Sequence, residues 1–242
     1  IESKLFPKRG KYLDWIAALE KEDDADSVIQ VAREGLSKVP RDYTVRAEIA
    51  KTISKIGERR SDNKLKLEGY RECFYSNPSI KYLLDLYITS IECGCFEEMR
   101  EEVERRIMEL QGKGRMPVTD CRDRERDMSY VSESVIINAL LLGGRYEKVF
   151  DMCKDKEPLG WSSGNNPEPV FTAFIMVVLS KEGIHSKMLY KQWEDVIGYT
   201  ECGMRGEYIE KYRKVAAHTI KQYITLNQEH EKFYLEWCKD EI

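Results

Sequence analysis

The chain has 242 residues and a formal net charge of −4, with 34% charged and 42% hydrophobic residues. This balance excludes a disordered polyelectrolyte and gives no overall attraction to nucleic acid or to an anionic membrane. The apolar run 170–179 predicts a buried helix, because a bilayer span needs about 20 apolar residues. Seven scattered cysteines without a framework spacing predict reduced thiols and a cytoplasmic protein. Because the first residue is Ile1, we expect a fragment of a longer protein or a processed one.

The dominant apolar period along the chain is helical. Apolar residues recur every three or four positions, as in Val45, Ile49, Ile53 and Ile56, and such a stripe is the buried face of an amphipathic helix. Alternation typical of strands is almost absent. The pattern predicts helices near 11–21, 25–39, 42–60, 63–76, 79–93, 96–111, 128–142, 144–155, 168–181, 187–198 and 205–240.

Proline and capping residues separate the early stripes. The stretch 39–42, Val-Pro-Arg-Asp, ends one predicted helix and offers Asp42 as the N-cap of the next. The stretch 76–79, Ser-Asn-Pro-Ser, carries the same signals. A proline cannot continue the preceding helix but is tolerated at the start of the following one.

A short pattern recurs after 38 residues. Arg33, Glu34 and a small residue precede a large apolar residue and Pro40, and the same order holds from Arg71 to Pro78. A period of this length with two helices per unit is typical of tetratricopeptide-like repeats. We therefore predict an all-α fold of antiparallel helix pairs in a tetratricopeptide-like right-handed solenoid. The repeats are expected over 1–112, and 113–242 is expected to be a helical continuation, packed as one unit with the first part or as a more irregular bundle.

Cys93 and Cys95 lie on either side of Gly94 between two apolar stripes. Two cysteines at this spacing are half of a tetrahedral zinc site, which needs two further ligands. No second pair follows, and His185, His218 and His230 are isolated. We therefore favour a tight turn between packed helices, with Gly94 in the left-handed conformation, and predict no metal or cofactor.

The first half of the chain resembles the helical region of proteins that carry a SWIM zinc finger. The resemblance rests on the stretches 12–15 (Tyr-Leu-Asp-Trp), 31–36 (Val-Ala-Arg-Glu-Gly-Leu), 46–50 (Arg-Ala-Glu-Ile-Ala), 70–74 (Tyr-Arg-Glu-Cys-Phe), 77–79 (Asn-Pro-Ser) and 81–83 (Lys-Tyr-Leu). It implies a partner-binding module attached to a nucleic-acid-binding finger, without catalytic activity of its own. The finger's ligands are Cys-x-Cys followed by Cys-x-His, and this chain has no Cys-x-His. The finger itself is therefore expected upstream of Ile1.

Two basic stripes are candidate nucleic-acid contacts. The first consists of Lys51, Lys55 and Arg59; the second consists of Lys211, Lys214 and Lys221, with His218 between them. Helical spacing places each set on one face, where cations neutralise phosphates in a salt-dependent way. The alternative interpretation is a solvated helix face, because acidic residues are interspersed in both stripes.

No pattern in the chain marks an active site. Gly112–Gly114 and Gly143–Gly144 lack the preceding strand of a phosphate-binding loop, and no cysteine is marked as a nucleophile beside a histidine. We predict a non-catalytic protein-interaction scaffold with a protein partner, no membrane contact and no small-molecule substrate. The alternative is a nucleic-acid-associated accessory region that contacts DNA or RNA weakly through the basic stripes.

Overall fold

The computed structural model describes residues 9–113 and 128–145 together with positions 148, 149, 152, 211, 214, 215, 218, 219 and 222. The chain divides into two compact units, Ile1–Val135 and Ile136–Ile242. The described residues form an all-α fold, as predicted, in which the one non-helical pairing is an isolated antiparallel bridge between Tyr43 and Met128. The helices are α2 (Arg9–Lys21), α3 (Ala25–Lys38), α4 (Val45–Arg60), α5 (Asn63–Ser76), α6 (Ile80–Glu92), α7 (Phe96–Lys113) and α8 (Glu133–Leu142).

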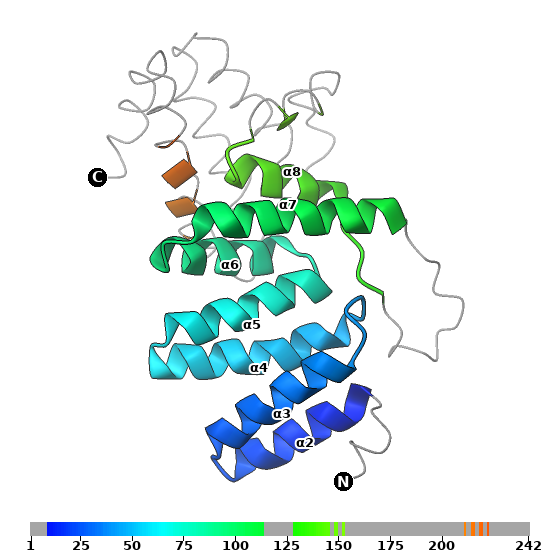
Figure 1. Cartoon of the computed structure of the whole chain (residues 1–242), viewed down its shortest axis with the longest axis vertical. Coiled ribbons are helices and arrows are strands. Elements are labelled where there is room, and N and C mark those ends of the chain that lie inside the picture. The colour runs from blue at the N-terminus through cyan, green and yellow to red at the C-terminus, as the bar shows by residue number, and fades with distance from the viewer. Residues whose placement is uncertain are drawn as a thin grey trace, which may run out of the picture. The chain divides into compact units, whose positions relative to one another are not determined.

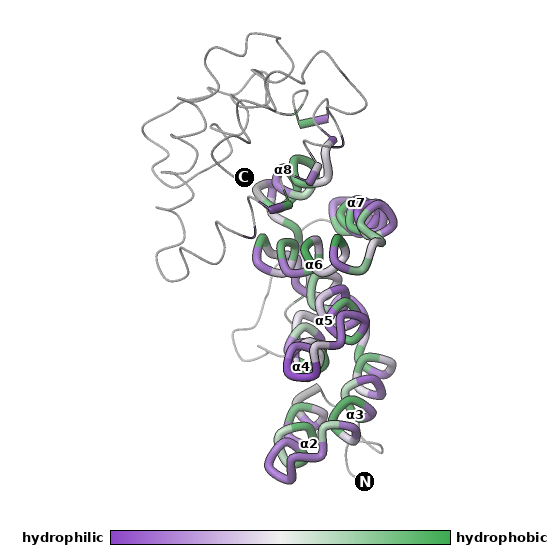
Figure 2. The backbone as a smooth tube through the Cα atoms, turned by 90° about the vertical axis from the view of Figure 1, so that its left-hand side faces the viewer, coloured by the Kyte–Doolittle hydropathy of each residue, from purple (hydrophilic) through white to green (hydrophobic). Residues whose placement is uncertain are grey.

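The first unit is a succession of short helices, each packed against the next. Consecutive helices reverse direction from α2 to α7 (Figure 1), and each contacts its neighbour in the sequence. The predicted stripe of α4 is buried at Ile49, Ile53 and Ile56. Hydrophobic and hydrophilic residues are interspersed along these helices (Figure 2), as expected for helices buried on one side.

Polar side chains fix the starts of several helices. Asp24 accepts from the Ser27 amide at 3.0 Å, and Asp62 accepts from the amides of Lys64 and Leu65 at 3.0 Å. Ser79 caps α6 as the sequence suggested. These side chains satisfy amides that have no partner within their own helices.

Two predicted helix starts are wrong. The helix predicted from 42 begins at Val45, and Thr44, not Asp42, is its N-cap. The Asp42 carboxylate is instead used in a tertiary cluster described below. The helix predicted from 128 begins at Glu133, because the preceding residues pair with the α3–α4 connection. In both cases a long-range contact outweighs the local helical tendency.

The α4–α5 hairpin is the most closely packed pair. A Cβ atom on Gly57 would lie 2.6 Å from the Lys66 backbone nitrogen, and one on Gly69 would lie 2.4 Å from the Ser54 nitrogen. Glycine at these two positions lets the helix backbones approach each other directly. The connection is short, and Ser61 adopts the left-handed conformation with φ of 53°.

The repeated Arg residues make equivalent contacts. Arg33 of α3 donates both Nε and Nη2 to Glu68 of α5, at 2.7 and 2.6 Å. Arg71, its counterpart 38 residues later, donates the same two groups from α5 to Glu102 of α7, at 2.6 and 2.8 Å. Bidentate pairs of this kind hold the planar guanidinium in one orientation. The first pair links α3 to α5, and the second links α5 to α7.

The next two residues of the repeat are also equivalent. Glu34 accepts from the Tyr12 hydroxyl of the preceding helix at 3.5 Å, and Glu72 accepts from Arg46 of its preceding helix. The small residue that follows lies against that same helix: a Cβ on Gly35 would be 3.0 Å from the Tyr12 ring. The 38-residue pattern is thus repeated in the helix contacts as well as in the amino-acid sequence.

A buried arginine closes the C-terminal end of α5. Arg106 has 1% side-chain exposure, and its Nε donates to the Tyr75 carbonyl at 2.9 Å. Its Nη2 donates to Asp42 at 2.9 Å, and Lys113 donates to the other oxygen of that carboxylate at 2.6 Å. The final carbonyls of a helix have no partner within it. Arg106 therefore caps α5 while its own charge is neutralised.

The segment before α8 completes this arrangement. The Ser129 amide donates to the Asp42 carbonyl at 2.7 Å, and the Ser129 hydroxyl donates to the carbonyl of Ser76, the last residue of α5. A segment remote in sequence thereby joins the α3–α4 connection and the end of α5.

In the second unit, the described part of α8 is buried on all sides. Residues Ile136 through Leu142 are each 9% exposed or less. The isolated described positions between 148 and 222 are helical. The predicted helices 168–181 and 187–198, with the apolar run 170–179, lie outside the described residues, as do most of 144–155 and 205–240. Continuation of the array through 113–242 stays a prediction.

Candidate functional site

A charged cleft lies between the α2–α3 turn and α4. It encloses about 330 Å³. Its walls come from two consecutive hairpins, and Ala25 and Val28 at the start of α3 supply its apolar part. The residues that line it are Glu20, Asp23, Asp24, Ala25, Val28, Lys55, Glu58 and Arg59.

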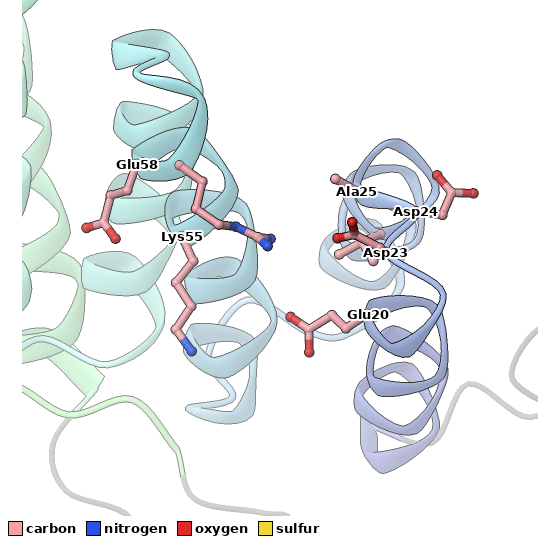
Figure 3. A pocket seen from close by; sticks show the side chains of 8 residues that line it. Glu20, Asp23, Asp24, Ala25, Lys55 and Glu58 are labelled. Atoms are coloured by element: carbon pink, nitrogen blue, oxygen red, sulfur yellow. The ribbon is translucent and has the colours of Figure 1, made fainter.

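Opposite charges face each other across the cleft. Figure 3 shows Glu20 and Asp23 on the α2–α3 side and Lys55 on the α4 side. All three side chains, and that of Arg59, are exposed. Within the described part of the chain, neither of these two carboxylates forms an ion pair, and neither of the two cations does. The charges are therefore available to a ligand.

The other two acids of the cleft are already engaged. Asp24 caps α3, and its hydrogen bonds with Ser27 lower the pKa of its carboxyl. Glu58 accepts from the Tyr70 hydroxyl on α5. Burial raises the pKa of Tyr70 strongly, and the hydrogen bond with Glu58 raises it further. Both acids keep their negative charge but point away from the cleft in Figure 3. Glu20 and Asp23 are therefore the carboxylates placed to contact a ligand directly.

The three residues of the first basic stripe do not share one environment. Lys55 and Arg59 line the cleft, but Lys51 does not, and its ammonium lies 3.7 Å from Glu48 in the same helix. The cations predicted to meet phosphate thus face carboxylates of α2 and of the α2–α3 turn. This arrangement makes the local potential mixed, not positive.

The second stripe lies partly outside the described residues. Lys211 and Lys214 are in helical conformation, with Lys214 exposed, whereas Lys221 is not described. His218 is part-buried. These positions belong to the second unit, and whether the two stripes share a surface stays an open prediction.

The Cys-x-Cys stretch is a turn between helices, as predicted. Cys93 follows α6, Cys95 precedes α7, and Gly94 has φ of +70°. The Cys93 thiol donates to the Asn63 carbonyl at 3.6 Å. Burial raises the pKa of Cys95, and the neighbouring Cys93 adds to this effect. Among the described residues, no group of three or more His, Cys, Asp or Glu side chains is placed to hold a metal ion.

Sequence reasoning missed the acidic wall of the cleft. Neither Glu20 nor Asp23 was singled out from the sequence. A usable signal is present, since the stretch 20–24, Glu-Lys-Glu-Asp-Asp, is the most acidic interhelical connection of the first unit. Its position opposite α4 follows only from packing of one hairpin on the next.

Comparisons of the chain with protein-family models, with curated proteins and with solved structures found no match. The class of the protein is therefore described from its structure alone, as an all-α module with a charged cleft. In the part of the chain that the structure describes, no helix has both the length and the apolar character required to cross a bilayer.

Proposed function

We propose that the first unit is a non-catalytic scaffold that binds a segment of a partner protein. The observation that carries this proposal is the repetition of contacts between hairpins. Arg33 and Arg71 each clamp a helix to the next-but-one helix, and Glu34 and Glu72 each bind the preceding helix. Such arrays present extended surfaces formed by successive units, which suit elongated polypeptide ligands.

The finer description of this array is a tetratricopeptide-like solenoid. Its support is the conversion of a 38-residue sequence repeat into equivalent helix contacts. We extend the proposal to a parent protein with a SWIM zinc finger, on the resemblance of the stretches that contain Arg33 and Arg71. Reading the coding sequence upstream of Ile1 tests this extension: Cys-x-Cys followed by Cys-x-His supports it, and a different domain refutes it.

The most direct test of scaffold function is selection of ligands from a random-peptide library displayed on phage. The full 242-residue chain is immobilised, and an unrelated all-α protein removes nonspecific binders. The expected result is enrichment of peptides that bind the chain in solution with micromolar Kd. Failure to enrich any peptide refutes the scaffold. Salt-sensitive binding of labelled DNA or RNA then favours the nucleic-acid alternative.

A further inference from the structure

The cleft between the α2–α3 turn and α4 holds unpaired charges of both signs. Four carboxylates and two cations line it. Glu20 and Asp23 form its acidic wall on the α2–α3 side. Lys55 and Arg59 form its basic wall on α4, beside Glu58, which is turned away from the cleft in Figure 3. None of the four residues that form the two walls is in an ion pair within the described part of the chain. The separation of the walls leaves room for a ligand between charges that otherwise attract each other.

The sign of these charges selects among ligand classes. A purely anionic chain, such as a nucleic-acid backbone, gains attraction from Lys55 and Arg59 but is repelled by Glu20 and Asp23. A purely cationic chain is attracted by Glu20 and Asp23 but is repelled by Lys55 and Arg59. A ligand with both signs pairs with both walls at once, whereas like-charge contacts weaken binding of the other two classes.

The size and lining of the cleft point to a narrow ligand. A volume of about 330 Å³ is at the lower end of the range for ligand pockets. Ala25 is part-buried and offers a small apolar surface to the ligand's methylene groups, whereas Val28 is buried beneath the cleft. In an extended peptide, successive side chains point to opposite sides. If acidic and basic residues alternate, all acidic side chains lie on one side of the extended peptide and all basic side chains on the other. Each side can then face the wall of opposite charge.

We propose that this cleft binds an extended peptide segment in which acidic and basic side chains alternate. The acidic side chains face Lys55 and Arg59, and the basic side chains face Glu20 and Asp23. This inference rests on the proposed scaffold function and names the chemistry of its partner.

The test compares peptides of equal length by fluorescence anisotropy with the full chain at low salt. The main probe is a fluorescein-labelled decapeptide of five Glu-Arg repeats. A block peptide of five Glu followed by five Arg has the same composition and net charge. Decapeptides of Glu alone and of Arg alone complete the set. We expect the alternating peptide to bind about threefold to tenfold more tightly than the others, with the advantage decreasing as salt rises.

Matched protein variants locate the binding. Lys55→Glu and Glu20→Lys are expected to weaken the alternating peptide about threefold to tenfold. Lys64→Glu and Glu22→Lys change the net charge identically at exposed positions that do not line the cleft, and both are expected to stay within twofold of the wild type. Circular dichroism verifies that each variant is folded.

The possible outcomes separate this inference from the scaffold proposal. Equal binding of the block peptide, or tightest binding of the all-Glu or the all-Arg peptide, would overturn the alternating-charge ligand. Equal effects of Lys64→Glu and Lys55→Glu would overturn it as well. If library peptides are enriched but are insensitive to Lys55→Glu, the cleft inference fails and the scaffold stands. If no library peptide is enriched, the scaffold itself fails. Binding of a labelled DNA oligonucleotide that Lys55→Glu abolishes also overturns the inference.

Discussion

Replacement of Gly69 by alanine should separate α4 from α5. The new Cβ would lie 2.4 Å from the Ser54 nitrogen and 2.8 Å from its Cα. The nearer distance is about 1 Å inside the 3.4 Å at which ordinary contact begins. Because the opposing atoms belong to the backbone of α4, no rotation of a side chain relieves the clash. The two helices must move apart.

The magnitude follows from two opposing effects. Overpacking of a well-packed interface costs about 1–3 kcal/mol, and a gap of about 1 Å elsewhere in the interface forfeits up to half of the dispersion energy there. Alanine recovers about 1 kcal/mol of helix propensity over glycine. Because the clash is with backbone atoms, the overpacking cost is in the upper part of its range, and we expect Gly69→Ala to lower the free energy of unfolding by about 1–2 kcal/mol. At roughly 3 °C per kcal/mol, Tm falls by about 3–6 °C.

Gly112 provides the matched control. It also lies in a helix, near the end of α7, but a Cβ there meets no atom within 4 Å. Gly112→Ala should raise the free energy of unfolding by up to about 1 kcal/mol. Urea titration of the full chain, followed by circular dichroism at 222 nm, measures both variants. Equal stability of the two variants would refute close packing of α4 on α5 at this point.

Three further predictions concern Arg106, Asp42 and Cys73. Arg106→Met should lower the free energy of unfolding by about 3 kcal/mol, because the Tyr75 carbonyl and the Asp42 carboxylate lose a buried partner; unchanged urea denaturation would contradict this. Burial raises the pKa of Asp42, but hydrogen bonds from basic side chains outweigh it and lower the pKa. Its stabilising effect is therefore complete above about pH 4 and is lost as pH falls further, so Asp42→Asn should flatten the acid limb of a stability–pH profile. Burial also strongly raises the pKa of Cys73, which is 0% exposed, so iodoacetamide should label Cys93 much faster in peptide mapping; equal rates would count against the packing of α5.

Much of the helical content was predictable because it depends on local spacing. The stripe through Ile49, Ile53 and Ile56 specifies a helix and its buried face without knowledge of the partner. Ser79 was identified as a cap for the same reason, since a cap bonds within its own turn. The left-handed Gly94 likewise follows from the immediate neighbours.

Prediction failed where a distant group competes with local preference. Asp42 has the right chemistry for an N-cap, but its carboxylate makes stronger contacts with Arg106 and Lys113 on α7. Met128 and the residues after it fit a helical period, yet Met128 pairs with Tyr43, and the Ser129 amide donates to the Asp42 carbonyl. No spacing along the chain could reveal either partner.

The candidate site divides in the same way. The sequence by itself determined that Lys55 and Arg59 share one face of α4, because one turn of helix separates them. Only the tertiary structure decided that Glu20 and Asp23 lie opposite that face. Helix periodicity is a property of covalent geometry and local hydrogen bonds, whereas the charge across a cleft depends on how one hairpin packs on another. A basic stripe in the sequence therefore became one wall of a cleft with both signs of charge.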